Sequence, residues 1–82
     1  MNLFPTEAYL TRVRPELNMQ RFYTLSIVPD LFGGCSLVRR WGRIGSSGSS
    51  KRIEYYEHEG KAVDALMNWI KAKTKRGYQV LS

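Results

Sequence analysis

The most constraining feature of this sequence is a change in hydrophobic period near residue 59. Before it, apolar and polar residues alternate in short runs, which is typical of strands whose successive side chains face opposite sides of a sheet. After it, apolar residues recur with the spacing of one helix face. Several strands followed by one helix predict an α+β fold. The alternating runs are residues 8–14, 21–28, 35–43 and 51–56, and the helical run is residues 59–76.

The helical run carries one apolar stripe, and its end is marked by a glycine. The stripe consists of Val63, Leu66, Met67 and Ile70. Gly77 suits the position just after a helix C-terminus, and residues 78–81 are predicted to return to the sheet as a short strand. We therefore expect an antiparallel meander of four to five strands, with one α-helix in the C-terminal half packed on one face. Residues 1–82 are expected to form a single domain.

Proline and glycine mark the boundaries between the predicted strands. Pro15 lacks a backbone donor, so the first strand should end there and could lie at an edge of the sheet. Residues 29–34 read Pro-Asp-Leu-Phe-Gly-Gly, which predicts a reversal that pairs the second strand with the third. Residues 45–50 contain only glycine and serine. They predict either a flexible loop or a set of backbone N–H groups available to an anion.

The charge balance favours a polyanionic partner. Thirteen Lys and Arg residues against seven Asp and Glu give a net charge of +6, which places nucleic acid first and a membrane surface second. One cysteine, Cys35, and one histidine, His58, cannot supply a disulfide or a usual zinc site, so we expect no metal and no cofactor. Neither a secretory signal nor a membrane span is indicated, and we expect a cytoplasmic protein. The sequence shows no acid, base and nucleophile at a spacing typical of a catalytic site, so we do not expect an enzyme.

The heptad at residues 39–45, Arg-Arg-Trp-Gly-Arg-Ile-Gly, is the best indication of function. In a strand, Arg39, Trp41 and Arg43 would share one face, while Arg40 would point to the other. Two cations beside one indole can hold phosphate and stack on a sugar or base, as proteins do that bind nucleic acid with little sequence preference. Alternatively, Trp41 belongs to the core and the arginines are solvated strand charges.

Together these segments resemble the WGR domain, a family named after the Trp-Gly-Arg that stands here at residues 41–43. The resemblance includes residues 18–23, Asn-Met-Gln-Arg-Phe-Tyr, and the turn at residues 29–34, and it extends from about residue 13 to residue 80. In DNA-dependent poly(ADP-ribose) polymerases such domains bind DNA ends. The resemblance implies that Trp41 stacks on a terminal sugar, that Arg43 contacts phosphate or a partner, and that Tyr78 contacts the backbone.

The sequence as a whole predicts a non-catalytic module that binds nucleic acid, with DNA ends or breaks as the expected target. Its contacts are Trp41, Arg43 and Arg39, with Tyr78 and Lys51 as weaker candidates. The alternative is a protein-interaction adaptor that uses the same Trp-Arg face, because Trp and Arg dominate such interfaces. The basic residues between 71 and 76 are interpreted as a solvated helix end, and Trp69 as the rim of the helix core.

Overall fold

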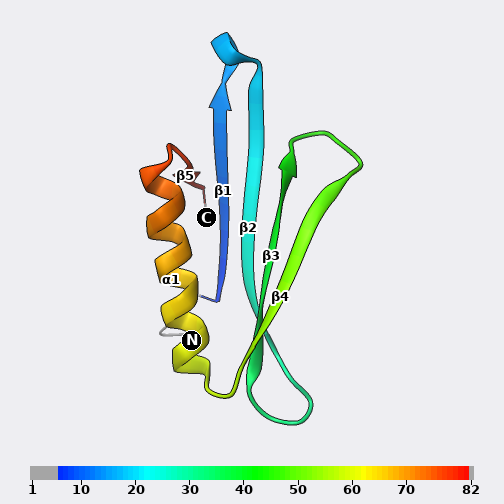
Figure 1. Ribbon diagram of the computed structural model, residues 1–82, viewed down its shortest axis with the longest axis vertical. Helices are drawn as coiled ribbons and strands as arrows, with labels where there is room; N and C mark the ends of the chain where they lie inside the picture. The colour runs from blue at the N-terminus through cyan, green and yellow to red at the C-terminus, as the bar shows by residue number, and fades with distance from the viewer. Residues whose placement is uncertain (1–5, 82) are drawn as a thin grey trace.

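A computed structural model describes residues 6–81 of the chain. They form one five-stranded antiparallel sheet with a single α-helix on one of its faces (Figure 1), so the predicted α+β fold is confirmed. The elements are β1 (Glu7–Arg14), a short 3-10 helix η1 (Pro15–Leu17), β2 (Met19–Pro29), β3 (Cys35–Arg43), β4 (Ser49–Tyr56), α1 (Glu59–Lys75) and β5 (Gln79–Val80).

The sheet is a meander to which the end of the chain adds one strand. Its order is β4-β3-β2-β1-β5, and β5 pairs antiparallel with β1 through Leu10 opposite Val80 and Thr11 opposite Gln79. The expectation that the first strand could be an edge strand is therefore wrong. Pro15 does end β1, but Gly77, at φ +97°, lets the chain turn back after α1 and cover that edge.

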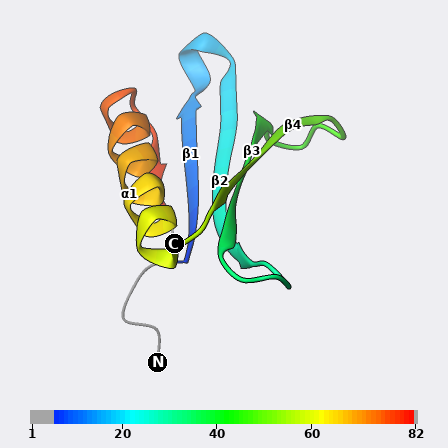
Figure 2. The same ribbon diagram turned by 60° about the horizontal axis from the view of Figure 1, so that its bottom comes forward.

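The core lies between the sheet and α1, and strand alternation selects its members. The buried residues that form it are Ala8, Leu10, Tyr23, Leu25, Leu37 and Leu66. Figure 2 shows α1 on one side of the sheet and, within the described residues, no helix or strand over the other side. Each fully buried leucine contributes about 2 kcal/mol through the hydrophobic effect. The sheet face that carries Leu10, Leu25 and Leu37 is thus held against the helix.

The buried stripe of α1 is rotated from the one the sequence predicted. Ala62, Val63 and Leu66 are buried and Ile70 packs partly against the core, but Met67 is half exposed. The predicted place of Met67 in the stripe is therefore wrong. Trp69 packs against the core in its stead, because the contact side of the helix is centred on Ala62, Leu66 and Trp69.

The β2–β3 reversal forms where the sequence predicts it. The backbone N–H of Asp30 donates to the carbonyl of Gly34 at 3.1 Å, and the N–H of Phe32 donates to the Asp30 carboxylate at 2.9 Å. Gly34 has φ +74°, and a Cβ there would lie 2.6 Å from the Tyr55 hydroxyl oxygen and 2.6 Å from the backbone oxygen of Tyr56. The glycine is required both by its dihedral angle and by the close approach of β4.

Comparison of Gly34 with Gly45 separates the effect of the dihedral angle from the effect of the close approach of β4. Gly45 has a similar φ of +83°, but nothing lies within 4 Å of an added Cβ. We expect Gly45→Ala to lower the free energy of unfolding by about 1 kcal/mol and Gly34→Ala by about 3 kcal/mol or more. Urea denaturation of the two variants measures the difference. Equal destabilisation would contradict the packing of β4 against this turn.

Candidate nucleic-acid interface

Trp41 lies on the sheet face that α1 covers, near the end of the helix. Arg39 and Arg43 share this face with it, as the alternation predicted, and Arg40 lies on the opposite face. The indole stacks on the ring of Tyr23, with centroids 5.6 Å apart and planes 14° from parallel. Tyr23 is buried and Trp41 is only partly buried. Trp41 is thus packed on one side and accessible on another, which combines the two interpretations that the sequence left open.

Tyr23 is the centre of an aromatic cluster drawn from three elements and the segment after α1. The ring of Trp69 stacks on it at 6.2 Å, and Tyr78 meets it edge-on at 6.2 Å. The ammonium of Lys73 lies 4.5 Å above the centroid of Tyr23 and 5.6 Å from that of Tyr78. The helix end and the residue that follows it therefore join Trp41 at one site.

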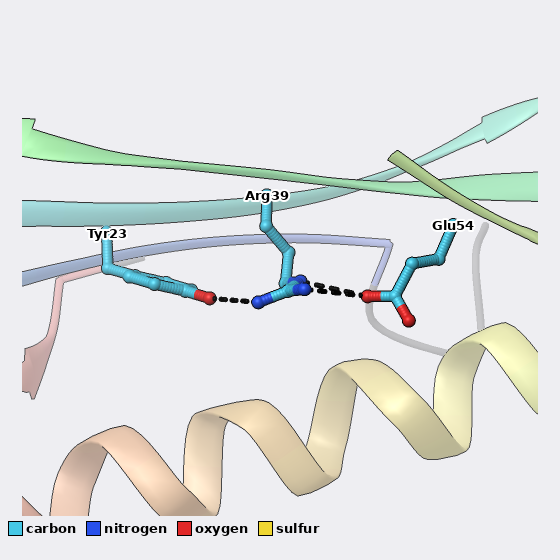
Figure 3. Close-up of polar contacts among 3 residues, drawn as sticks. All are labelled: Tyr23, Arg39 and Glu54. Atoms are coloured by element: carbon cyan, nitrogen blue, oxygen red, sulfur yellow. Dashed lines mark hydrogen bonds and ion pairs between the residues drawn. The ribbon is translucent and has the colours of Figure 1, made fainter. Parts of the chain in front are cut away.

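Arg39 is buried next to this cluster and supports it through contacts with Tyr23 and Trp69. Its side chain bonds to Glu54 on β4, with Nε 3.1 Å and Nη2 2.9 Å from Oε1, and its Nη1 donates to the Tyr23 hydroxyl at 3.0 Å (Figure 3). The guanidinium carbon also lies 4.0 Å from the centroid of the Trp69 ring. Each nitrogen of Arg39 is therefore already engaged by the protein.

The surroundings of Arg39 keep it charged and limit what else it can contact. Burial lowers the pKa of Arg39, but hydrogen bonds and charges from Tyr23 and Glu54 raise it more, so the net shift is upward. Only 7% of the residue is exposed. The contact of Arg39 with phosphate stays a prediction. The contacts that are present fix the ring of Tyr23 and, through it, the platform of Trp41.

A row of three arginines adjoins the aromatic cluster. Arg21 on β2 is paired in register with Arg12 on β1 and with Arg43 on β3, so the three side chains share one face on adjacent strands. Neighbouring strands are about 4.8 Å apart, and like charges at that spacing repel one another. Within residues 6–81 none of the three forms an ion pair.

The surroundings of this arginine row suit an anion. Arg43 Nη2 has a long contact of 3.4 Å with the side-chain oxygen of Asn18. The buried Nε of Arg12 has no acceptor among the described residues. Figure 1 shows β1 and β2 extending past the end of α1, which leaves this part of the sheet face open. An anion bound at Arg21 and Arg43, which are both exposed, would relieve the repulsion and accept hydrogen bonds from their guanidinium groups.

An open groove connects Arg21 and Arg43 of the arginine row to the aromatic cluster. Its volume is about 500 Å³. Gly42 contributes to its wall, and a Cβ there would approach the Gly48 carbonyl oxygen to 3.2 Å and the Phe22 ring to 3.3 Å. A second hollow of about 370 Å³ lies between Trp41 and Trp69. Trp41, Tyr23 and Lys73 border both spaces. The side chains that give the groove its charge and aromatic surface are Arg21, Arg43, Lys73, Trp41 and Tyr78.

The predicted site residues are therefore only partly brought together. Trp41, Arg43 and Tyr78 line the groove, and the buried Arg39 borders the second hollow. Lys51 is paired in register with Arg40, which places it on the face opposite Trp41. Its contact with nucleic acid stays a prediction, and the structure gives it no place in the groove.

Three residues of the interface were missed by sequence reasoning. Arg12 and Arg21 belong to predicted strands, but only the register of those strands aligns them with Arg43. Lys73 was interpreted as part of a solvated helix end. Burial, then the charges of Arg76 and Arg39, lower the pKa of Lys73 from its ordinary value. Its spacing of seven residues from Leu66, two helical turns along the same face, was the available signal.

Cys35 is buried, and burial followed by the charge of Glu59 raises the pKa of its thiol, in accord with a space-filling role. Residues 6–81 contain no group of three or more His, Cys, Asp or Glu side chains arranged to hold a metal ion. Over the same range, no helix is both long and apolar enough to cross a membrane.

Comparison with known proteins gives one family and one relative. Residues 6–82 match the WGR domain. The chain is 40% identical over 75 residues to y4dW, an uncharacterized protein of Sinorhizobium fredii. The match covers 92% of this chain and 36% of that relative, so the chain spans about a third of the relative's length. No solved structure matches the chain.

Replacement of Arg39 tests whether it organises the cluster. Arg39→Met would leave Glu54 and the Tyr23 hydroxyl without their partner, and we expect it to lower the free energy of unfolding by about 2 kcal/mol. Arg40→Met removes a neighbouring charge from the exposed face and should cost less than about 0.5 kcal/mol. Urea denaturation gives both values, and near-ultraviolet circular dichroism should report altered aromatic packing in Arg39→Met alone. Two variants of equal stability would refute the organising role.

Proposed function

The chain belongs to the WGR domain family, which is linked to nucleic-acid binding, and from that premise we propose that it is a non-catalytic module that binds DNA ends or breaks. The observation that supports this proposal most is the meeting of two surfaces in one groove. Arg21 and Arg43 of the arginine row provide a site for phosphates. Trp41 provides an aromatic platform beside it.

The two surfaces suit different parts of a DNA end. Guanidinium groups on adjacent strands can bind successive phosphate oxygens through charge-assisted hydrogen bonds. The accessible part of the Trp41 ring can stack on a sugar or base that no neighbouring base pair covers, and a duplex exposes such a group at an end or a break. Lys73 and Tyr78, which line the same groove, are placed to contact the backbone between these points.

The geometry also separates contact residues from positioning residues. Trp41, Arg21, Arg43 and Lys73 have surface in the groove. Arg39 acts through Tyr23, whose ring supports Trp41. We therefore propose that Arg39 sets the orientation of the platform, while the phosphate contacts come from the arginine row. Packing between Trp41 and Tyr23 keeps the indole in one orientation before DNA binds, which reduces the entropy lost on binding.

Loss of the platform should weaken binding to ends specifically. We expect Trp41→Ala to lower the affinity for a blunt, linear duplex by about 1 to 3 kcal/mol, the value of one stacking contact. Binding to covalently closed circular DNA, which has no end, should change little. Fluorescence anisotropy measures the linear duplex, with the closed circle as competitor, and Ile53→Ala on the opposite face is the control.

A folded Trp41→Ala variant that binds the blunt duplex as tightly as the parent would contradict the stacking role. If the parent bound neither DNA at low salt, and a protein partner were lost on replacing Trp41, the adaptor function of this face would be supported instead. Trp and Arg are the side chains that most often dominate protein interfaces, so this outcome has a physical basis.

The salt dependence of DNA binding reports the number of phosphate contacts. Three contacts, from Arg21, Arg43 and Lys73, predict a slope of log affinity against log salt of about −2.7 on duplex DNA. Arg21→Gln and Arg43→Gln should each make that slope less steep by about 1, while Arg40→Gln on the opposite face should leave it unchanged. Lys51→Gln is the informative comparison. An effect of Lys51→Gln equal to that of Arg21→Gln would show that the groove is not the main phosphate site.

A further inference from the structure

The β2–β3 turn carries the most exposed apolar residues of the described chain. Leu31 is 97% exposed and Phe32 is 96% exposed. The molecule is 45 Å long, and Figure 1, drawn with that axis vertical, shows this turn at the bottom and η1, beside the arginine row, at the top. Single exposed apolar residues are common on protein surfaces, but two adjacent large ones at a protruding tip mark a candidate interaction site.

The turn that presents these residues is held by several hydrogen bonds. Asp30 holds it through its carboxylate, which accepts from the Phe32 N–H, and through its carbonyl, which accepts from the Gly33 N–H at 3.3 Å. The Tyr55 hydroxyl donates to the carbonyl of Gly33 at 3.1 Å, which ties the turn to β4. The exposed pair is therefore displayed by a backbone whose conformation is already fixed. A binding surface gains from this, because little entropy remains to be lost.

The charges near the turn differ in sign from those of the groove. Asp30 is within the turn. Glu57 and Glu59 line a hollow of about 550 Å³, which Pro29 and Gly34, at the two ends of the turn, also line. Carboxylates there disfavour nucleic acid and anionic lipid, both of which would otherwise suit a basic protein. They favour a partner that places Lys or Arg side chains around an apolar pocket.

We propose that Leu31 and Phe32 form a docking tip for a protein partner, which receives the two side chains in an apolar pocket bordered by basic residues. The tip and the groove lie at opposite ends of the long axis, so both can be occupied at once. The module would then join a nucleic acid at one end to a protein at the other. The proposal for the tip depends only on the geometry and charge of the turn and its surroundings, so it is independent of DNA binding.

The probe for this tip is a phage-displayed library of random short peptides, selected on the full chain. We expect the selected peptides to combine aromatic or branched apolar residues with Lys or Arg. The double variant Leu31→Ser/Phe32→Ser should bind them at least about tenfold more weakly. Asp30→Asn and Glu57→Gln should reduce the salt dependence of the binding. Ile53→Ser, which alters another exposed apolar residue, should leave it unchanged.

Other occupants of the tip give different results. Selected peptides that bind the double variant as tightly as the parent, or that lack basic residues, would overturn the proposal. So would weaker binding of the double variant to phosphatidylserine vesicles or to duplex DNA, or self-association of the parent in sedimentation that the double variant abolishes. If the parent fails to bind DNA while the peptides behave as expected, the proposed function fails and the docking tip remains.

Discussion

The buried guanidinium of Arg39 is the interaction on which the candidate site depends. It originates on β3 and contacts Tyr23 on β2, Glu54 on β4 and Trp69 on α1, so one charged group connects four elements. A buried charge is costly unless its hydrogen bonds are made, and this requirement restricts where each of its neighbours can lie. The ring of Tyr23 is thereby fixed, and the ring of Trp41 stacks on it. The orientation of the Trp41 ring is thus a consequence of the hydrogen bonds that Arg39 makes.

The different lengths of the sheet and the helix explain where the site lies. α1 covers the core face as far as the rings of Tyr23 and Trp41, where Lys73 reaches the aromatic cluster. The next residues on that face, two positions further along each strand, are Arg21 and the two arginines paired with it, Arg12 and Arg43. They lie where the helix no longer covers the sheet. Apolar residues of the same face are thus buried under the helix, while Arg21 and Arg43 are left exposed and Arg12 is half-buried against Gly77.

The sequence predicts the strands, the helix and the shared face of Arg39, Trp41 and Arg43, because these depend only on local periodicity. It does not predict what strand register and helix rotation decide. Arg12 and Arg21 join Arg43 through pairing across two interfaces, and Lys51 is separated from Trp41 because β4 pairs it with Arg40. The burial of Arg39 could not be predicted either, since its acceptors come from residues 16 and 15 positions away. Long-range contacts of this kind leave no periodic signal.

The central claim is that one groove, built on the Arg39 contacts, receives a DNA end. Its most direct test is a nuclear magnetic resonance titration of the isotope-labelled chain with a short blunt duplex. We expect the largest chemical-shift changes at the Trp41 indole N–H and at the signals of Arg21, Arg43, Lys73 and Tyr78. The opposite face of the sheet and the β2–β3 turn should change little. Changes centred on Arg40 and Lys51, or none at the Trp41 indole, would contradict it.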